Sequence, residues 1–266
     1  MFRPLVIGHA CAAGEAPANT LAGVGSALSA GADAMEIDVQ LSADGVPVLM
    51  HDETVDRTTN LQGRVRELPL AALLGADAGD GEPVPTLDQV FDLVAGRLTV
   101  MCELKATPGE PVYDQRLVDA VLGVIASHGA RAWAAIHSFN PDMVQRARAT
   151  DRAVSAAIIS VPLEGDQMAR VRDSIFARNG QADFTVPVES VQIGSLLDAV
   201  LDRNGQAISV EHHCVTPELV RVAKQRQVTI WAWTADREHH WERLVAAGVD
   251  GIITNVPHKL RAYLSR

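Results

Sequence analysis

With 266 residues, 47% of them hydrophobic, the chain is long enough to bury a large core, which suits one α/β domain or two small ones. Its net charge of -10 argues against a nucleic-acid-binding protein, because phosphate contacts need a clustered excess of Lys and Arg. No apolar run is long enough to span a bilayer, so no stable membrane insertion is expected.

The N-terminal stretch MFRPLVIGHACAAGEA is a weak candidate for a signal peptide, because it has one Arg and its short apolar run is interrupted by His9. We therefore expect a cytoplasmic protein. The cysteines are few, odd in number and far apart, at Cys11, Cys102 and Cys214, which suggests neither a disulfide framework nor a thiolate zinc cluster. The sequence gives no indication of the oligomeric state.

Short β-rich runs alternate along the chain with longer stretches at helical spacing. The predicted strands cover residues 4–9, 32–40, 98–105, 133–138, 153–160, 207–212, 229–235 and 250–255. Predicted helices, several with a Thr, Asn or Asp start and a Gly stop, cover residues 20–31, 86–96, 114–129, 142–150, 216–227 and 238–248. Eight strands, each followed by a helix, predict an α/β fold of the closed (β/α)8 TIM-barrel type, and we expect residues 1–266 to form one domain.

Two regions interrupt this alternation. Residues 41–85 form a small insertion after the second predicted strand, with a hairpin expected at Asp44 and Gly45. Residues 161–206 are predicted to hold two helices where the pattern requires one. No internal sequence repeat and no linker composition divides the chain.

Charged residues gather at the ends of two predicted strands. Glu36 and Asp38 are two residues apart, as are Glu103 and Lys105, so each pair shares one face of its strand. Active sites of TIM barrels lie at the carboxyl ends of the strands, where both pairs would meet. Three converging carboxylates repel one another unless they are protonated or bound to a metal, and an all-oxygen set suits Mg²⁺ or Ca²⁺ better than zinc. The alternatives are solvated carboxylates and a simple salt bridge between Glu103 and Lys105.

Two histidines fall near the same expected mouth. His9 ends the first predicted strand, and His51 follows the strand VPVLM of the insertion. Imidazoles exchange protons near neutral pH, so a cation, a lysine and two histidines together provide the groups needed to cleave a phosphodiester. Histidines satisfied within the core are the alternative.

At these positions the sequence resembles the glycerophosphodiester phosphodiesterase family, from one end of the chain to the other. The matching segments are VIGH (6–9), APANTLAG (16–23), GADAMEIDVQLSADGVPVLMHDETVDRTTN (31–60), VPTLDQVF (84–91), CELK (102–105), IWAWTAD (230–236) and GVDGIITNVP (248–257). The resemblance implies a divalent cation, Mg²⁺ or Ca²⁺, and a small-molecule phosphodiester substrate. Its implied site residues are the metal ligands Glu36, Asp38 and Glu103, the phosphate contact Lys105, and the general acid/base pair His9 and His51.

Two further residues have weaker assignments. The resemblance implies that Trp233 lines the pocket for the alcohol part of the substrate, although barrel packing, as for Trp231, is the alternative. Arg57, in the matched DRTTN, is a candidate anion contact or an anchor for the insertion. The implied reaction yields an alcohol and a phosphomonoester such as glycerol 3-phosphate. Attack by a substrate hydroxyl, giving a cyclic phosphate as in related phospholipase D toxins, stays open, as do the individual roles of the two histidines.

Two motifs depart from the family pattern. The family usually has Arg and Gly after its first histidine and Glu before Asn-Thr, whereas this chain has Ala10, Cys11 and Ala18 at these positions. Losing a cation and a carboxylate together leaves no unpaired buried charge if the two groups pair in relatives. The alanines fit an enlarged pocket for a different phosphodiester, weakened catalysis, or a non-catalytic barrel that binds a phosphorylated ligand. The intact metal and histidine set favours the first.

The other thiol and imidazole groups receive structural interpretations. Cys11 is expected to be a small buried hydrophobe rather than a nucleophile. We expect His137, His212 and His213, at strand ends, to have structural or supporting roles because no second ligand set accompanies them. Exposure to solvent is expected for His239 and His240, in a predicted surface helix, and for His128, near the end of another predicted helix.

Overall fold

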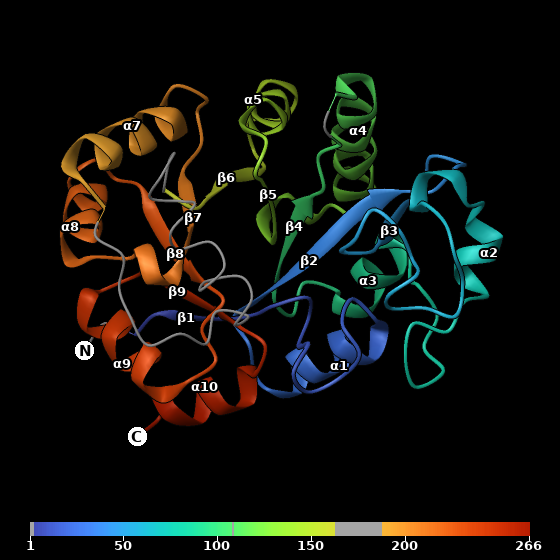
Figure 1. Cartoon of the computed structure of the whole chain (residues 1–266), viewed down its shortest axis with the longest axis horizontal. Helices are drawn as coiled ribbons and strands as arrows, with labels where there is room; N and C mark the ends of the chain where they lie inside the picture. Colours follow the sequence, from blue (N-terminus) through green and yellow to red (C-terminus); the bar gives the residue numbers. More distant parts are fainter. Residues whose placement is uncertain (1–2, 108, 163–187) are drawn as a thin grey trace.

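A computed structural model describes residues 3–107, 109–162 and 188–266, and these form a closed barrel (Figure 1). The ring closes because β1 pairs in parallel with both β2 and β9, so the predicted (β/α)8 barrel is confirmed. Its eight parallel strands are β1 (Leu5–Gly8), β2 (Ala34–Leu41), β4 (Thr99–Leu104), β5 (Ala134–Ser138), β6 (Ser155–Ser160), β7 (Ala207–Glu211), β8 (Thr229–Trp233) and β9 (Gly251–Thr254).

Helices surround the barrel in the described part of the chain, and several begin at the expected capping residues. The side chains of Thr20, Thr86 and Thr216 accept a backbone N–H of the helix that follows each of them. Of the two helices predicted within residues 161–206, one is α7, and the other falls on residues 163–187, outside the described residues. The larger helices are α1 (Leu21–Ser29), α3 (Leu87–Val94), α4 (Pro111–Ser127), α5 (Pro141–Thr150), α7 (Ser190–Leu201), α8 (Pro217–Gln225), α9 (Glu238–Ala247) and α10 (Pro257–Leu264).

The insertion after β2 lies at one side of the barrel (Figure 1). Its strand β3 (Pro47–Leu49) runs antiparallel to β2, and the turn between them places Gly45 at a φ of 77°, which confirms the predicted hairpin. The short helices η1 (Val65–Glu67) and α2 (Leu70–Leu74) follow. These segments bury an apolar cluster of their own, consisting of Val48, Met50, Val55, Val65, Leu73, Ala76 and Val84.

Side chains that point into the barrel change from apolar to polar along the strands. A small cluster inside the barrel comprises Ile7, Ala34, Met101, Ala135 and Ile253. Two residues further along β2, β4 and β5, and therefore on the same face, the buried side chains are Glu36, Glu103 and His137. The apolar layer therefore seals the barrel below, and polar groups occupy its carboxyl end.

Among the described residues, no helix combines the length and the apolar composition needed to cross a membrane. Two further 3-10 turns complete the described structure: η2 (Ala130–Ala132) precedes β5, and η3 (His212–Cys214) follows β7.

Candidate active site

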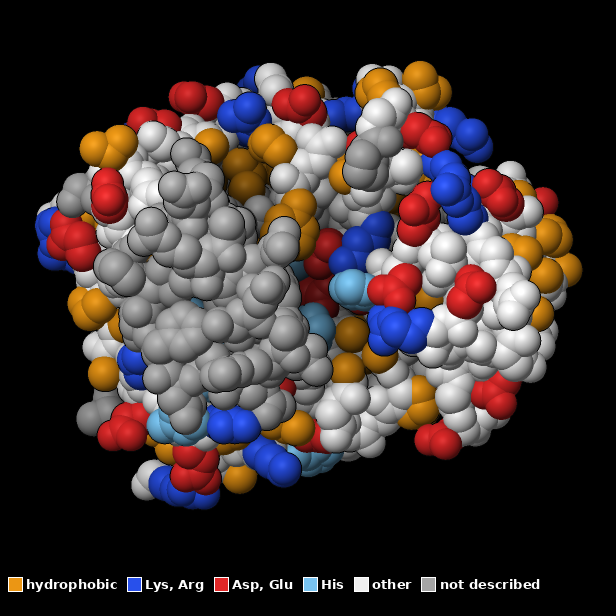
Figure 2. Space-filling view, in the orientation of Figure 1, with side chains coloured by type: hydrophobic (Ala, Val, Ile, Leu, Met, Phe, Trp, Pro, Cys, Tyr) orange, Lys and Arg blue, Asp and Glu red, His pale blue; other side chains and the backbone are white. Residues whose placement is uncertain are grey.

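A cavity of about 1060 Å³ opens at the carboxyl end of the barrel. Figure 2 shows acidic and histidine side chains at the bottom of a hollow near the centre of this face. The structure brings together all of the residues that the sequence predicted for the site, because the cavity lining includes His9, Glu36, Asp38, His51, Arg57, Glu103, Lys105 and Trp233.

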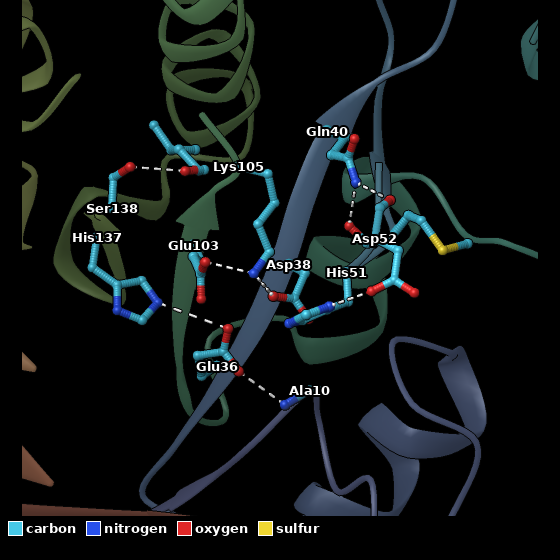
Figure 3. A network of polar contacts seen from close by, with 12 residues as sticks. Ala10, Glu36, Asp38, Gln40, His51, Asp52, Glu103, Lys105, His137 and Ser138 are labelled. Carbon is cyan, nitrogen blue, oxygen red and sulfur yellow. Dashed lines mark hydrogen bonds and ion pairs between the residues drawn. The ribbon is translucent and has the colours of Figure 1, made fainter. Parts of the chain in front are cut away.

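Four of these residues form a group that we name the carboxylate cluster: the buried Glu36 and Asp38 on β2 and Glu103 on β4, and the half-buried Lys105 directly after β4 (Figure 3). The strands pair so that Asp38 lies opposite Glu103. The Lys105 Nζ lies 2.7 Å from Asp38 Oδ1 and 2.5 Å from Glu103 Oε1. The salt bridge considered as an alternative for Glu103 and Lys105 is therefore present.

One ammonium group does not balance three carboxylates. Burial, followed by the charges of Asp38 and Glu103, raises the pKa of Glu36 well above its usual range. Burial also raises the pKa of Glu103, against the opposing effect of Lys105. Burial opposes ionisation of Asp38 as well, but the charges of Lys105, His51 and His9 outweigh it and lower the pKa of Asp38. The cluster is therefore short of positive charge, mainly at Glu36.

The segment after β1 supports this cluster from the side. The backbone N–H of Ala10 donates to Glu36 Oε2 at 2.9 Å, from a left-handed conformation with a φ of 42°. Asn19 Nδ2 donates to Asp38 Oδ2 at 2.7 Å, and the backbone N–H of Asp38 donates to Asn19 Oδ1 at 3.1 Å. Ala10 and Ala18, the two departures from the family pattern, both line the cavity.

His9 is oriented by a chain of polar contacts that ends at Asp236. Its Nδ1 lies 2.7 Å from Asn255 Oδ1. Asn255 Nδ2 donates to Asp236 Oδ2 at 2.7 Å, which turns the amide oxygen toward the imidazole. His9 Nδ1 therefore carries the hydrogen, and the lone pair of Nε2 lies on the side of Glu36, with 3.9 Å between Nε2 and Glu36 Oε2.

His51 is oriented by a carboxylate instead. Its Nδ1 lies 2.7 Å from Asp52 Oδ1, and Arg57 Nε donates to Asp52 Oδ2 at 2.6 Å. The hydrogen bond from Arg57, helped by the one from His51 and opposed by partial burial, lowers the pKa of Asp52 to about 2. Arg57 thus lies at the cavity wall and also anchors the segment that carries His51.

Trp233 forms part of the apolar wall of the cavity. Its ring meets that of Phe139 edge to face, with 5.8 Å between the ring centroids, and the Phe139 side chain is 51% exposed. Cys11 is fully buried, and burial, together with the charges of Glu36 and Asp38, raises the pKa of its thiol well above the usual range. The interpretation of Cys11 as an unreactive core residue agrees with this environment.

Sequence reasoning missed several residues of the cavity wall and its supports. Asn19 and Asn255 lie in the matched segments APANTLAG and GVDGIITNVP, but nothing in those segments indicates that they contact Asp38 and His9. His137, expected to be structural or supporting, also lines the cavity. Its Nε2 lies 3.9 Å from Glu36 Oε1, and burial, followed by the charge of Lys105, lowers its pKa to about 3.

A second group of imidazoles, which we name the histidine cluster, comprises His212, His213 and His240. The expectation that His240 is exposed to solvent was wrong, because its side chain is 3% exposed and its ring centroid lies 4.4 Å from that of His212. The turn η3 folds back toward α9, where His240 and Leu244 share one face. His212 and His213 thus have a third histidine nearby, which the sequence did not indicate.

Charges of both signs flank the histidine cluster. Glu211 Oε1 lies 2.6 Å from His213 Nδ1, and Glu211 Oε2 accepts the backbone N–H of His213 at 2.8 Å. Arg243 Nη2 donates to the backbone oxygen of His212 at 2.8 Å. Within the described residues, a carboxylate and a guanidinium therefore lie beside the three rings.

A (β/α)8 barrel with three buried carboxylates, a lysine and two oriented histidines in one cavity defines a class of protein, the barrel hydrolases of phosphoric diesters. The family model "glycerophosphoryl diester phosphodiesterase family" matches residues 9–259. The glycerophosphodiester phosphodiesterase of Caldanaerobacter subterraneus subsp. tengcongensis is 30% identical over 270 residues, which cover 97% of this chain and 97% of that protein. The chain therefore belongs to the glycerophosphoryl diester phosphodiesterase family.

Other relatives agree with this assignment. Glycerophosphodiester phosphodiesterase 1 of Mus musculus is 27% identical over 257 residues, covering 90% of this chain and 75% of the mouse protein. The crystal structure of a homologue from Silicibacter pomeroyi DSS-3 matches with a TM-score of 0.82 and 26% identity, covering 99% of this chain and 95% of that one. The chain is accordingly a phosphoric diester hydrolase.

Proposed function

We propose that this enzyme hydrolyses a glycerophosphodiester to an alcohol and a phosphomonoester such as glycerol 3-phosphate, with the help of one divalent cation. The observation that carries the proposal is that the carboxylate cluster shares one cavity with two histidines whose Nδ1 atoms are each held by a separate partner. Such an arrangement leaves both Nε2 atoms available for proton transfer. The activity in the names of its relatives is the same.

The carboxylate cluster fits a hard cation. Within the described residues, Glu36 Oε1 is buried and has no hydrogen-bond partner, and the pKa of Glu36 is raised because burial and two neighbouring carboxylates disfavour its charge. A cation held by Glu36, Asp38 and Glu103 would relieve both effects, and oxygen ligands suit Mg²⁺ or Ca²⁺. When bound, a divalent cation supplies Lewis-acid stabilisation of negative charge on a phosphate oxygen.

The two histidines receive different roles because their partners differ. We assign His9 as the general base, since the neutral Asn255 amide fixes Nδ1–H and leaves Nε2 with a lone pair for a proton of the attacking water. We assign His51 as the general acid, since Asp52 is a carboxylate whose charge stabilises the protonated ring before it gives its proton to the leaving alkoxide. Asp52 and Asn255 are thus positioning residues.

The remaining predicted residues bind the substrate. Lys105, held between Asp38 and Glu103, lies at the cavity wall and provides positive charge for the phosphate, with Arg57 at the rim. Trp233 and Phe139 offer an apolar surface for the alcohol part. With Ala10 and Ala18 in its lining, the cavity of about 1060 Å³ lies near the upper end of the usual size range for ligand pockets. We therefore expect a substrate whose alcohol part is bulky.

The test is release of phosphomonoester from a panel of glycerophosphodiesters and lysophospholipids, with Mg²⁺, Mn²⁺ or Ca²⁺ against EDTA. We expect turnover that requires the cation, and a loss of about a thousandfold or more in His51→Ala. His258→Ala, in which an exposed histidine outside the cavity is replaced, serves as the matched control and should keep its activity. Phosphorus NMR separates glycerol 3-phosphate from a cyclic phosphate. Absence of turnover in the folded, cation-loaded protein on every substrate would contradict the proposal.

A further inference from the structure

Strand pairing places His137 in the same row as two members of the carboxylate cluster. The register joins Asp38 on β2 to Glu103 on β4, and Glu103 to His137 on β5. Neighbouring strands carry paired residues at the same height, and all three side chains point into the barrel. Glu36 lies two residues before Asp38 on the same face, so His137 and Glu36 border the same space below Glu103 (Figure 3).

The polar atoms around this space lack partners. His137 is 2% exposed, and neither of its ring nitrogens has a hydrogen-bond partner among residues 3–107, 109–162 and 188–266. Glu36 Oε1, which faces His137 Nε2 across 3.9 Å, has no hydrogen-bond partner in the same part of the chain. Buried polar atoms of this kind are costly unless something binds them, so the space between the two is suited to a ligand of both.

The distances fit a shared metal ion. One ligand atom each from Glu36, Glu103 and His137 can be chosen so that all three lie within 4.8 Å of one another. Ligand atoms that are each about 2.0–2.4 Å from a common ion lie at most roughly 4.8 Å apart, when they are on opposite sides of it. Asp38 has less freedom to contribute, because Asn19 holds its Oδ2 and Lys105 lies 2.7 Å from its Oδ1.

We propose that His137 Nε2 is a ligand of the divalent cation, together with Glu36 and Glu103. The inference rests on the cation-dependent function proposed above and deepens it, because a nitrogen ligand changes which ions the site prefers. Imidazole suits later first-row ions such as Co²⁺ and Zn²⁺ better than Mg²⁺ or Ca²⁺, which favour oxygen. The site therefore selects a first-row transition ion, and Mg²⁺ or Ca²⁺ binds more weakly.

The direct test needs no variant. Protein stripped of metal is loaded with Mn²⁺, and pulsed electron paramagnetic resonance is used to look for nitrogen coupled to the ion, in natural-abundance protein and in protein labelled with ¹⁵N-histidine. We expect a histidine nitrogen coupling whose frequency changes with the label. If Mn²⁺ binds without such a coupling, the nitrogen ligand is wrong while the carboxylate site stands. If no divalent ion binds at all, the cation-dependent function fails with it.

Variants then identify the histidine. His137→Gln should remove the nitrogen coupling and weaken Co²⁺ binding by about 10–100-fold in calorimetric titrations, while Mg²⁺ binding changes less than about threefold. His258→Gln, at an exposed histidine, should change neither and controls for the substitution. His9 is the rival, because its Nε2 also lies 3.9 Å from a Glu36 oxygen. Loss of the coupling in His9→Gln, with its persistence in His137→Gln, would overturn the assignment.

Discussion

Two groups of buried polar side chains lie at the carboxyl ends of the barrel strands, and they differ in how their charges are balanced. The carboxylate cluster holds three carboxylates against one ammonium group, and the pKa of Glu36 rises as a result of burial and repulsion. Among the described residues, a carboxylate, Glu211, and a guanidinium, Arg243, lie beside the three rings of the histidine cluster. The surplus of negative charge in the carboxylate cluster favours a hard cation at that place.

The largest expected effect is a loss of catalysis when the carboxylate cluster is changed, compared with a change beside the histidine cluster. Glu36→Gln should lower kcat/KM by about a thousandfold or more, because the cation loses a ligand whose charge holds it, while the metal-free protein should melt at the same or a higher temperature. Arg243→Met, beside the histidine cluster, should leave kcat/KM within about tenfold but lower the free energy of unfolding by about 1–3 kcal/mol. Steady-state kinetics and urea unfolding of both variants check this pair. Full activity in Glu36→Gln would contradict the proposal that the carboxylate cluster holds the cation.

A second change removes the ammonium group that partly neutralises the carboxylate cluster. In the absence of a cation, Lys105→Met should lower the free energy of unfolding by about 3–5 kcal/mol, because Asp38 and Glu103 lose their buried counter-charge. A saturating divalent cation should recover most of that loss, since it binds only the folded state. Lys259→Met, at an exposed lysine of the cavity mouth, is the control and should cost less than about 0.5 kcal/mol.

The pH dependence of stability tests the raised pKa of Glu36 in the carboxylate cluster. In EDTA, the raised pKa of Glu36 means that the folded state binds more protons than the unfolded state from about pH 4.5, the ordinary value, up to the raised pKa. Glu36 therefore stabilises the fold least at high pH, and its contribution to the free energy of unfolding should fall as the pH rises through this window. Urea unfolding at stepped pH measures the slope. Glu36→Gln should flatten it, and an unchanged slope in that variant would assign it to another group.

The smallest effect is expected at the exposed ion pair beside His51. Arg57 is 65% exposed in its side chain, so Arg57→Ala should change the free energy of unfolding by less than about 0.5 kcal/mol. Its loss should raise KM severalfold, because the segment carrying His51 loses an anchor and the rim loses a positive charge. Kinetics at several salt concentrations measure this. A fall in kcat beyond about a hundredfold would place Arg57 among the catalytic groups instead.

The sequence was sufficient for the barrel because its strands are buried on both faces and stand out as short β-rich runs between helices with recognisable caps. It was also sufficient to place Glu36, Asp38, Glu103 and Lys105 together, since alternation along a strand fixes which side chains share a face. Their roles in binding metal and substrate stay predictions, as does the cytoplasmic location.

What the sequence could not supply depends on distant contacts. Asn255 reaches His9 across 246 residues, and the row formed by Glu103 and His137 depends on a register that only folding fixes. The burial of His240 could be predicted from the sequence, because His240 lies four residues before the buried Leu244 and hence on the same side of α9.

The closure of the barrel has a consequence for how the site is completed. The carboxylate cluster lies on the neighbouring strands β2 and β4 and on Lys105 just after β4, whereas Asn255 follows β9, 246 residues after His9. Until β9 has docked beside β1, the imidazole of His9 has no amide to hold it. A polypeptide that lacks β9 would thus carry the carboxylate cluster without the contact that orients His9. Under the role proposed above for His9, docking of β9 beside β1 therefore completes the site.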